Sequence, residues 1–546
     1  MKKNSYFIFL LLAAFLIRLI FILGGHYISP DGTHYASLGY HLFHDLRYVS
    51  DGAQFPDIIQ PPLYPVLLGL LSLLLNPEYA GKFTSLLFGL ALIAVLYRFT
   101  KRLTGNEKLA FAAALFVALD PAMVAVSSQV ASEALYLFLL FALYATVLFY
   151  LRENRRSQIV AAALLNGLLY LTRPEGILYF VLLLLVFLVW RKPWRHVVMY
   201  FGLVMSFMVL YSWATHKELG YWTFSPKLNF VRAQGKVSRY FLQRDRQLNR
   251  TVEKKVRVQR TQYALSPHLK ELAANEIFKK NKSALRYFKI SPRTSKEKSR
   301  LLKQAAHHLY SNVILAAKKF LNGLAFPLGF WIFLLFGLWR FPLKKWKSAT
   351  GFSALFLTPV LLVLFVNVEQ RFLFMVPILL APLLGHGWLR IEHFLQERLW
   401  LQKRSALSWI ILYLFVFLSV YPGYAELWRK TRSKNYYYQV GRWLQKEIPD
   451  KKVVAAVRPQ AVFFAGKRYC PLPFAPLDSL ELYLRAKQAA FILLEEGDQK
   501  LRPGLLTLKR LPPFLRRDTT VQIQNKKFWL LRVTKEKTHE RTNAIH

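Results

Sequence analysis

Cysteine and acidic residues are both scarce in this sequence of 546 residues. Cys470 is the only cysteine, so no disulfide can form within the chain, and a small disulfide-held scaffold is excluded. Asp and Glu number 30 against 75 Lys and Arg, which gives a formal net charge of +45. Charged residues make up only 19% of the chain, whereas apolar residues make up 54%. This apolar content excludes disorder over most of the length.

Long apolar runs recur along the chain. Ser5–Gly24 and Ala131–Leu151 are each long enough to cross a hydrocarbon core of about 30 Å, which takes about 20 helical residues. A soluble enzyme is therefore excluded. The first run follows Lys2 and Lys3 and is interpreted as a retained signal anchor. We predict about 11 membrane spans, at 6–24, 80–98, 108–127, 131–150, 158–172, 175–190, 196–215, 322–340, 349–366, 372–389 and 406–423.

Basic residues occupy alternate short loops between these spans, and this asymmetry predicts the orientation. Clusters such as Arg152, Arg155 and Arg156 mark the inner side, whereas the short outer loops offer little beyond Arg47, Arg173 and Arg371. The expected location is the inner (plasma) membrane, with a cytoplasmic N-terminus. The apolar segment 61–75 is too short for a span and is expected to lie as a helix at the outer interface.

The predicted fold class is a polytopic α-helical membrane protein with a small C-terminal α/β domain on the outer face. The transmembrane region covers 1–424 and includes a first outer loop at 26–79 and a long basic outer loop at 216–321. Residues 216–320 hold 25 Lys and Arg against 6 Asp and Glu. The α/β domain covers 425–533, followed by a polar tail at 534–546. Its expected elements are a helix at 436–447, a strand at 452–457, a helix near 480–487, and strands at 491–495 and 528–533.

The positive charge by itself suggests polyanionic partners, namely nucleic acid, anionic lipid or phosphorylated glycan. Nucleic acid is not expected, because the chain has no compact basic domain with a recognisable reading motif. Much of the excess lies in short loops, where it is a signal of topology.

The first outer loop holds the residues best suited to chemistry. Asp31 follows Pro30 just outside the first span, where a carboxylate can act as a general base toward an incoming hydroxyl. The alternative is that Asp31 only caps a helix. Tyr35, Leu38 and Leu42 have the spacing of an amphipathic helix on a membrane surface.

Other polar residues leave two interpretations open. His34, His41 and His44 have near-helical spacing, which fits either a metal site or simply solvated side chains. Arg18 lies inside the first span and either extends to the interface or lines a groove. Asp120 before Pro121 is either a charge facing a cavity or the cap of a kinked helix.

Several motifs follow one another on the predicted outer face. They are Asp31-x-x-x-Tyr35-Ala, Pro-Pro-Leu-Tyr-Pro at 61–65, Ser-Glu-Ala-Leu at 132–135, Leu-Thr-Arg-Pro-Glu-Gly at 171–176 and Glu-Gln-Arg-Phe-Leu at 369–373. In order and placement they resemble the GT-C superfamily of membrane glycosyltransferases over roughly residues 5–425. More narrowly, they are similar to the bacterial family 39 type, which is related to protein mannosyltransferases and the lipid A aminoarabinose transferase. Asp31 is followed by Gly32 where many relatives have a second acidic residue.

This resemblance implies a sugar donor on a polyprenyl phosphate and an acceptor hydroxyl on the outer side, with membrane lipids around both. Asp31 would then deprotonate the acceptor as it attacks the anomeric carbon with inversion. The leaving phosphate needs cations at the reaction depth, and Arg371 and Arg173 are the candidates. A monophosphate donor requires no metal, although a divalent cation is compatible with the reaction. The candidates for the substrate groove are Tyr35, Tyr64, Glu133, Glu175 and Glu369.

Two other functions compete with a glycosyltransferase. A transporter or flippase for lipid or solute would show repeated halves and ionisable residues near the midplane, but the chain has no evident repeat. A non-enzymatic scaffold for the C-terminal domain would leave Asp31 and Arg371 freely replaceable. Neither the sugar nor the acceptor (a glycan, a lipid or a protein) follows from the sequence.

Overall fold

The computed structural model describes two compact units formed from interleaved parts of the chain. The first comprises Met1–His26, Pro61–Trp213 and Lys289–Arg432, and the second comprises Tyr27–Gln60, Ala214–Phe288 and Ser433–His546. The residues described are 5–50, 57, 60–219, 222–226, 310–315, 318, 326–339, 351–358, 370–398, 405–472, 480–481, 484–485, 487–496, 498 and 511–534.

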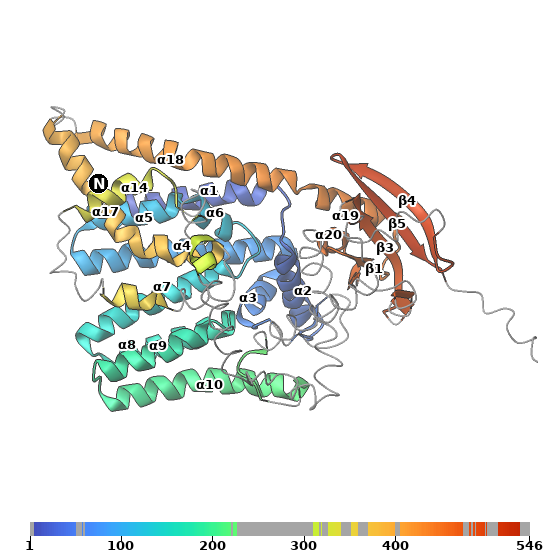
Figure 1. The fold of residues 1–546 in the computed structure, drawn as a ribbon, viewed down its shortest axis with the longest axis horizontal. Coiled ribbons are helices and arrows are strands. Elements are labelled where there is room, and N and C mark those ends of the chain that lie inside the picture. The colour runs from blue at the N-terminus through green and yellow to red at the C-terminus, as the bar shows by residue number, and fades with distance from the viewer. Residues whose placement is uncertain are drawn as a thin grey trace, which may run out of the picture. The chain divides into compact units, whose positions relative to one another are not determined.

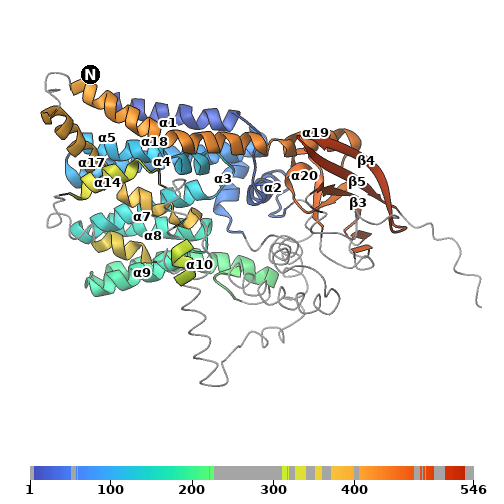
Figure 2. The same cartoon turned by 45° about the horizontal axis from the view of Figure 1, so that its top comes forward.

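The first unit is a bundle of apolar helices (Figures 1 and 2). Within the described residues, five helices are long and apolar enough to cross a membrane, and a bent pair makes a sixth. The five are α1 (Ser5–Leu23), α4 (Pro77–Thr104), α7 (Glu133–Glu153), α10 (Trp194–Leu219) and α18 (Ser405–Ser433). The bent pair is α5 (Glu107–Leu119) and α6 (Pro121–Ser127). The chain is therefore a multi-pass membrane protein.

Shorter helices complete the first unit. The predicted spans at 158–172, 175–190 and 372–389 correspond to α8 (Arg156–Thr172), α9 (Gly176–Val189) and α17 (Met375–Arg398). The segment expected at the interface forms α3 (Leu63–Ser72), and α14 (Phe330–Leu338) lies within the predicted span at 322–340. Parts of 322–340 and 349–366 lie outside the described residues, so the count of eleven spans stays a prediction.

The ends of α4 show how local sequence sets helix boundaries. The Asn76 side chain accepts a hydrogen bond from the Tyr79 N–H at 3.0 Å, and Pro77 occupies the first helical position. At the other end, Gly105 adopts φ +70°, a left-handed conformation that favours glycine and ends the helix.

The break between α5 and α6 resolves the two interpretations of Asp120. The chain bends by 65° there, and the Asp120 carboxylate caps α6 by accepting hydrogen bonds from Ala122 N at 2.7 Å and Met123 N at 3.3 Å. Arg18 from α1 donates to Ala118 O at 3.0 Å and is 1% exposed, so it lies in the interior and does not extend to the interface. Tyr424 from α18 donates to Leu119 O at 2.9 Å. Backbone groups freed by the break are thus bonded by side chains of neighbouring helices.

The second unit contains a five-stranded mixed sheet with strand order β2-β1-β3-β5-β4. β1 (Val453–Ala456) pairs in parallel with β2 (Arg468–Pro471) and β3 (Ala489–Glu495). β5 (Lys526–Val533) pairs antiparallel with β3 and with β4 (Leu515–Ile523). The expected small α/β domain is thus borne out in part, by this sheet and the helices that cover it.

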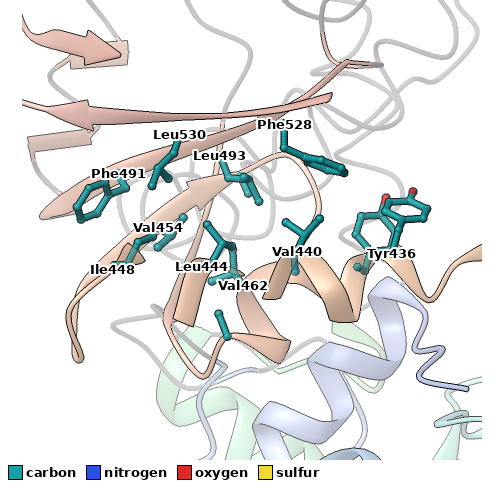
Figure 3. Close-up of a cluster of buried hydrophobic side chains, with 14 residues drawn as sticks. Tyr436, Val440, Leu444, Ile448, Val454, Val462, Phe491, Leu493, Phe528 and Leu530 are labelled. Atoms are coloured by element: carbon teal, nitrogen blue, oxygen red, sulfur yellow. The ribbon is translucent and has the colours of Figure 1, made fainter. Parts of the chain in front are cut away.

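Helices cover one face of this sheet (Figure 3). Val440 and Leu444 of α19 (Tyr436–Glu447) and Val462 of α20 (Gln460–Phe464) pack against Val454 and Leu493. Leu480 and Leu484 pack on the other face in a separate apolar cluster with Cys470. The helix α2 (Pro30–His44), from the first predicted outer loop, packs against α20 in the same unit.

A buried carboxylate joins α19 to the sheet. Glu495, at the end of β3, accepts hydrogen bonds from Arg458 at 2.7 Å and Lys526 at 2.6 Å. It also accepts from the hydroxyls of Tyr436 at 3.3 Å and Tyr437 at 3.2 Å. Burial lowers the pKa of Lys526, but its hydrogen bonds to Glu495 and Tyr436 outweigh burial and raise the pKa above the usual 10.5.

Candidate functional site

Three of the predicted site residues meet in the first unit. Arg173 Nη2 donates to Glu133 Oε1 at 2.8 Å, and Arg371 Nη1 donates to the same oxygen at 3.3 Å. The residues come from positions up to 238 apart in the sequence. We call these three residues the arginine–glutamate cluster.

Each member of the cluster lies at the end of a helix. Glu133 is the first residue of α7, Arg173 directly follows α8, and Arg371 lies in the short helix η3 (Gln370–Leu373). The turn after Arg173 is fixed by Asn166, whose amide donates to Gly176 O at 3.1 Å and accepts from Tyr200 at 2.8 Å. The sequence predicts each of these residues at the end of a membrane span. In the structure, both arginine side chains contact the Glu133 carboxylate.

The two arginines differ in burial. The Arg173 side chain is 5% exposed and its guanidinium lies 5.4 Å from the centre of the Tyr136 ring. The Arg371 side chain is 29% exposed and its contact with Glu133 is longer. Arg371 is therefore the cation of the pair that a ligand can reach more easily.

The remaining groove candidates of the first unit have different surroundings. Glu175 precedes α9 and lies close enough to Tyr136 and Tyr179 to interact with both electrostatically. The Tyr64 ring is fully buried, and its hydroxyl accepts from Ala131 N at 2.9 Å. Glu369 lies outside the described residues.

Asp31 and Tyr35 belong to the second unit, on α2. The cap of this helix is Ser29, whose hydroxyl accepts from Gly32 N at 3.0 Å, so the capping alternative for Asp31 is wrong. Asp31 lies in the first turn and is exposed, whereas Tyr35 on the packed side of α2 is only 6% exposed.

Two of the three histidines of α2 each contact one carboxylate, whereas His44 Nδ1 lies 3.0 Å from Tyr40 O. His34 Nε2 contacts Asp57, which also accepts from Gln60 N at 2.9 Å, and His41 contacts Asp45. Within the described part of the chain, no group of three or more His, Cys, Asp or Glu side chains could hold a metal ion.

Sequence reasoning missed one buried ion network near the predicted outer end of α1. Lys82 is 1% exposed and donates to Glu78 at 2.6 Å and to Gly25 O at 3.0 Å. Glu78 also contacts His26 Nδ1 at 2.9 Å. The signal was an acid and a base four residues apart where an apolar helix begins, because ionisable residues in spans are rarely incidental.

The chain resembles known proteins in one part of its sequence and in its overall fold. Residues 59–216 match the family model described as dolichyl-phosphate-mannose-protein mannosyltransferase, a segment that contains Tyr64, Glu133 and Arg173. No curated protein matches the chain in sequence.

Solved structures match over nearly the whole length. ArnT from Cupriavidus metallidurans in the apo state has a TM-score of 0.60 at 11% identity, covering 97% of this chain and 98% of that one. The archaeal oligosaccharyltransferase AglB from Archaeoglobus fulgidus, in complex with an inhibitory peptide and a dolichol-phosphate, has a TM-score of 0.54 at 13% identity. That match covers 91% of this chain and 70% of AglB.

Residues 59–216 thus resemble a family of membrane mannosyltransferases, and the chain as a whole shares the fold of ArnT and AglB. Both findings agree with the resemblance drawn from the ordered motifs.

Proposed function

We propose that the protein transfers a sugar from a polyprenyl-phosphate carrier to an acceptor hydroxyl on the outer face of the inner (plasma) membrane. The observation that carries this proposal is the convergence of Arg173 and Arg371 on Glu133 in a GT-C-type membrane fold. Arginines suit this role because their guanidinium groups match the geometry of phosphate oxygens. The structure of AglB contains a dolichol-phosphate, which supports a polyprenyl-phosphate donor.

In the proposed reaction, Asp31 takes the proton of the acceptor hydroxyl. The acceptor oxygen forms a bond to the anomeric carbon while the bond from that carbon to the phosphate oxygen breaks, and the configuration inverts. The polyprenyl phosphate leaves with the electron pair of the broken bond. Arg371, held with Arg173 by Glu133, stabilises the negative charge that develops on the phosphate. Ser29 is the N-cap of α2, and Asp31 lies further on in the first turn with an exposed side chain.

The test is sugar transfer by the full chain in proteoliposomes supplied with labelled polyprenyl-phosphate sugars and cell-envelope acceptors. Asp31→Asn should reduce transfer by about 10³-fold, since a general base contributes about 10²–10⁴-fold. Asp45→Asn is the matched control, because Asp45 ends the same helix and should leave transfer within about twofold.

Undiminished transfer by Asp31→Asn would remove the base assignment. No transfer to any acceptor by the unchanged chain, together with movement of the lipid across the bilayer, would instead favour a flippase.

A further inference from the structure

The Pro-Pro-Leu-Tyr motif places a tyrosine hydroxyl deep inside the first unit. Tyr64 O–H lies 3.1 Å from Gly81 O and 2.9 Å from Ser85 Oγ, both on α4. The same hydroxyl accepts from Ala131 N at 2.9 Å, and Ser85 Oγ donates to Ala131 O at 3.1 Å. Tyr64 and Ser85 have no measurable exposure.

These contacts form a closed ring around one peptide residue, which we call the Ala131 ring (Tyr64, Ser85 and Ala131). Each donor in this ring has an acceptor. The Ala131 N–H donates to the Tyr64 hydroxyl oxygen, and the Tyr64 O–H donates to Ser85 Oγ or to Gly81 O. The Ser85 O–H donates to the Ala131 carbonyl oxygen. Both backbone polar groups of Ala131 are therefore held by side chains of α3 and α4.

Close packing holds the adjacent residue as well. A Cβ atom added to Gly81 would lie 2.5 Å from Val130 Cγ1 and 2.8 Å from Leu68 Cδ1, so only a glycine allows this approach. Val130 and Leu68 are buried at 1% and 0% exposure. The chain at 130–131 is thus fixed by hydrogen bonds and by packing together.

Glu133 follows two residues after Ala131 and begins α7. Its carboxylate is the common partner of Arg173 and Arg371, so the position of Glu133 sets where the two guanidinium groups lie. A shift of the chain at Ala131 would move Glu133 and, through it, Arg371.

We infer that Tyr64 is a positioning residue for the phosphate site, acting through Ala131 and Glu133 without touching the substrate. This inference rests on the proposed function of Arg371. It gives the Pro-Pro-Leu-Tyr motif a role, and it links the predicted interfacial helix α3 to the charge that receives the donor.

The test uses binding of radiolabelled undecaprenyl phosphate to the full chain in nanodiscs. Tyr64→Phe removes only the hydroxyl and should weaken binding about tenfold, as expected for the loss of hydrogen bonds that orient a charged group. Ser85→Ala should act in the same direction and serves as the second variant if Tyr64→Phe folds poorly. Tyr97→Phe is the matched control, because Tyr97 is another largely buried tyrosine of the first unit, with its hydroxyl bonded to Glu107 at 2.7 Å near the far end of α4. It should leave binding unchanged.

A double-mutant cycle separates positioning from a general loss of stability. Arg371→Gln removes the group being positioned, so adding Tyr64→Phe to it should weaken binding no further. Additive effects, or wild-type binding by both Tyr64→Phe and Ser85→Ala, would overturn the positioning role while leaving the proposed function intact. Undiminished binding by Arg371→Gln would overturn both, and it is therefore a distinguishable result.

Discussion

Arg173 and Arg371 share one carboxylate oxygen but should respond differently to the same substitution. Arg173 is nearly buried at 5% exposure and contacts Glu133 at 2.8 Å, whereas Arg371 is 29% exposed and contacts it at 3.3 Å. We predict that Arg173→Gln mainly lowers stability and that Arg371→Gln mainly lowers affinity for the donor.

The expected changes in unfolding free energy and in donor affinity follow from how deeply each arginine is buried. Removing one partner of a buried ion pair costs about 3–5 kcal/mol, and Arg173→Gln should lie near the lower end because Arg371 still contacts Glu133. An ion pair that is partly open to solvent is worth about 0–1 kcal/mol, so Arg371→Gln should hardly change the free energy of unfolding. A charge-assisted hydrogen bond to phosphate contributes about 1.5–3 kcal/mol, which corresponds to roughly 10- to 150-fold weaker donor binding for Arg371→Gln.

Two measurements on each variant test whether stability or donor affinity is lost. Unfolding titrations in mixed micelles give the change in stability, and binding of radiolabelled undecaprenyl phosphate in nanodiscs gives the affinity. Arg390→Gln, which alters a cation on α17 outside the cluster, controls for the loss of one positive charge. Equal losses of stability for Arg173→Gln and Arg371→Gln, or unchanged lipid binding by Arg371→Gln, would refute the reasoning from burial.

Three further outcomes follow from other parts of the chain. Asp120→Ala should lower stability by about 1–2 kcal/mol, because two backbone N–H groups of α6 lose their cap; an unchanged unfolding midpoint would contradict this. Lys526 has a raised pKa, so its stabilisation of the C-terminal domain should be complete below pH 10.5 and decline as pH rises through the higher folded-state pKa. Circular dichroism against pH checks this, and Lys526→Met should abolish that decline. Chelation with EDTA should leave sugar transfer within about twofold if Arg371 neutralises the leaving phosphate, and a loss restored by Mg²⁺ would show otherwise.

The C-terminal domain shows what sequence pattern predicts well. The expected helix at 436–447 is α19 with the same bounds, and the expected strands at 452–457, 491–495 and 528–533 are β1, β3 and β5 within two residues at each end. These elements combine a clear apolar periodicity with Pro and Gly at their boundaries.

The elements that sequence missed are short or lie at the edge of the sheet. α20 has five residues and β2 has four, too few for any periodicity to show. β4 is an edge strand in which Arg516, Arg517 and Gln522 are exposed, so its sequence lacks the apolar run of a central strand.

The candidate site was predictable only as a set of separate residues. Their location at span ends on one predicted face singled out Glu133, Arg173 and Arg371, but no local pattern shows that the two arginines share one oxygen. The same limit applies to Tyr64, which its motif predicted to line the substrate groove. Its bond to Ala131 joins residues 67 apart and depends on how α3, α4 and α7 pack.

Charged residues inside or beside the apolar helices differ in whether they bond to backbone groups and in how exposed they are. Arg18, Asp120 and Lys82 are each about 1% exposed and bond, among other partners, to backbone groups near helix ends or breaks, so they complete the fold where a span is interrupted. Arg371 bonds to the Glu133 carboxylate and keeps 29% of its own side chain exposed. A cation whose donors are used by buried carbonyls cannot turn to a substrate without breaking the helix packing, whereas Arg371 can exchange part of its contact for a phosphate. This difference in partner and exposure, more than the presence of a charge in a span, makes Arg371 the residue on which the proposed chemistry depends.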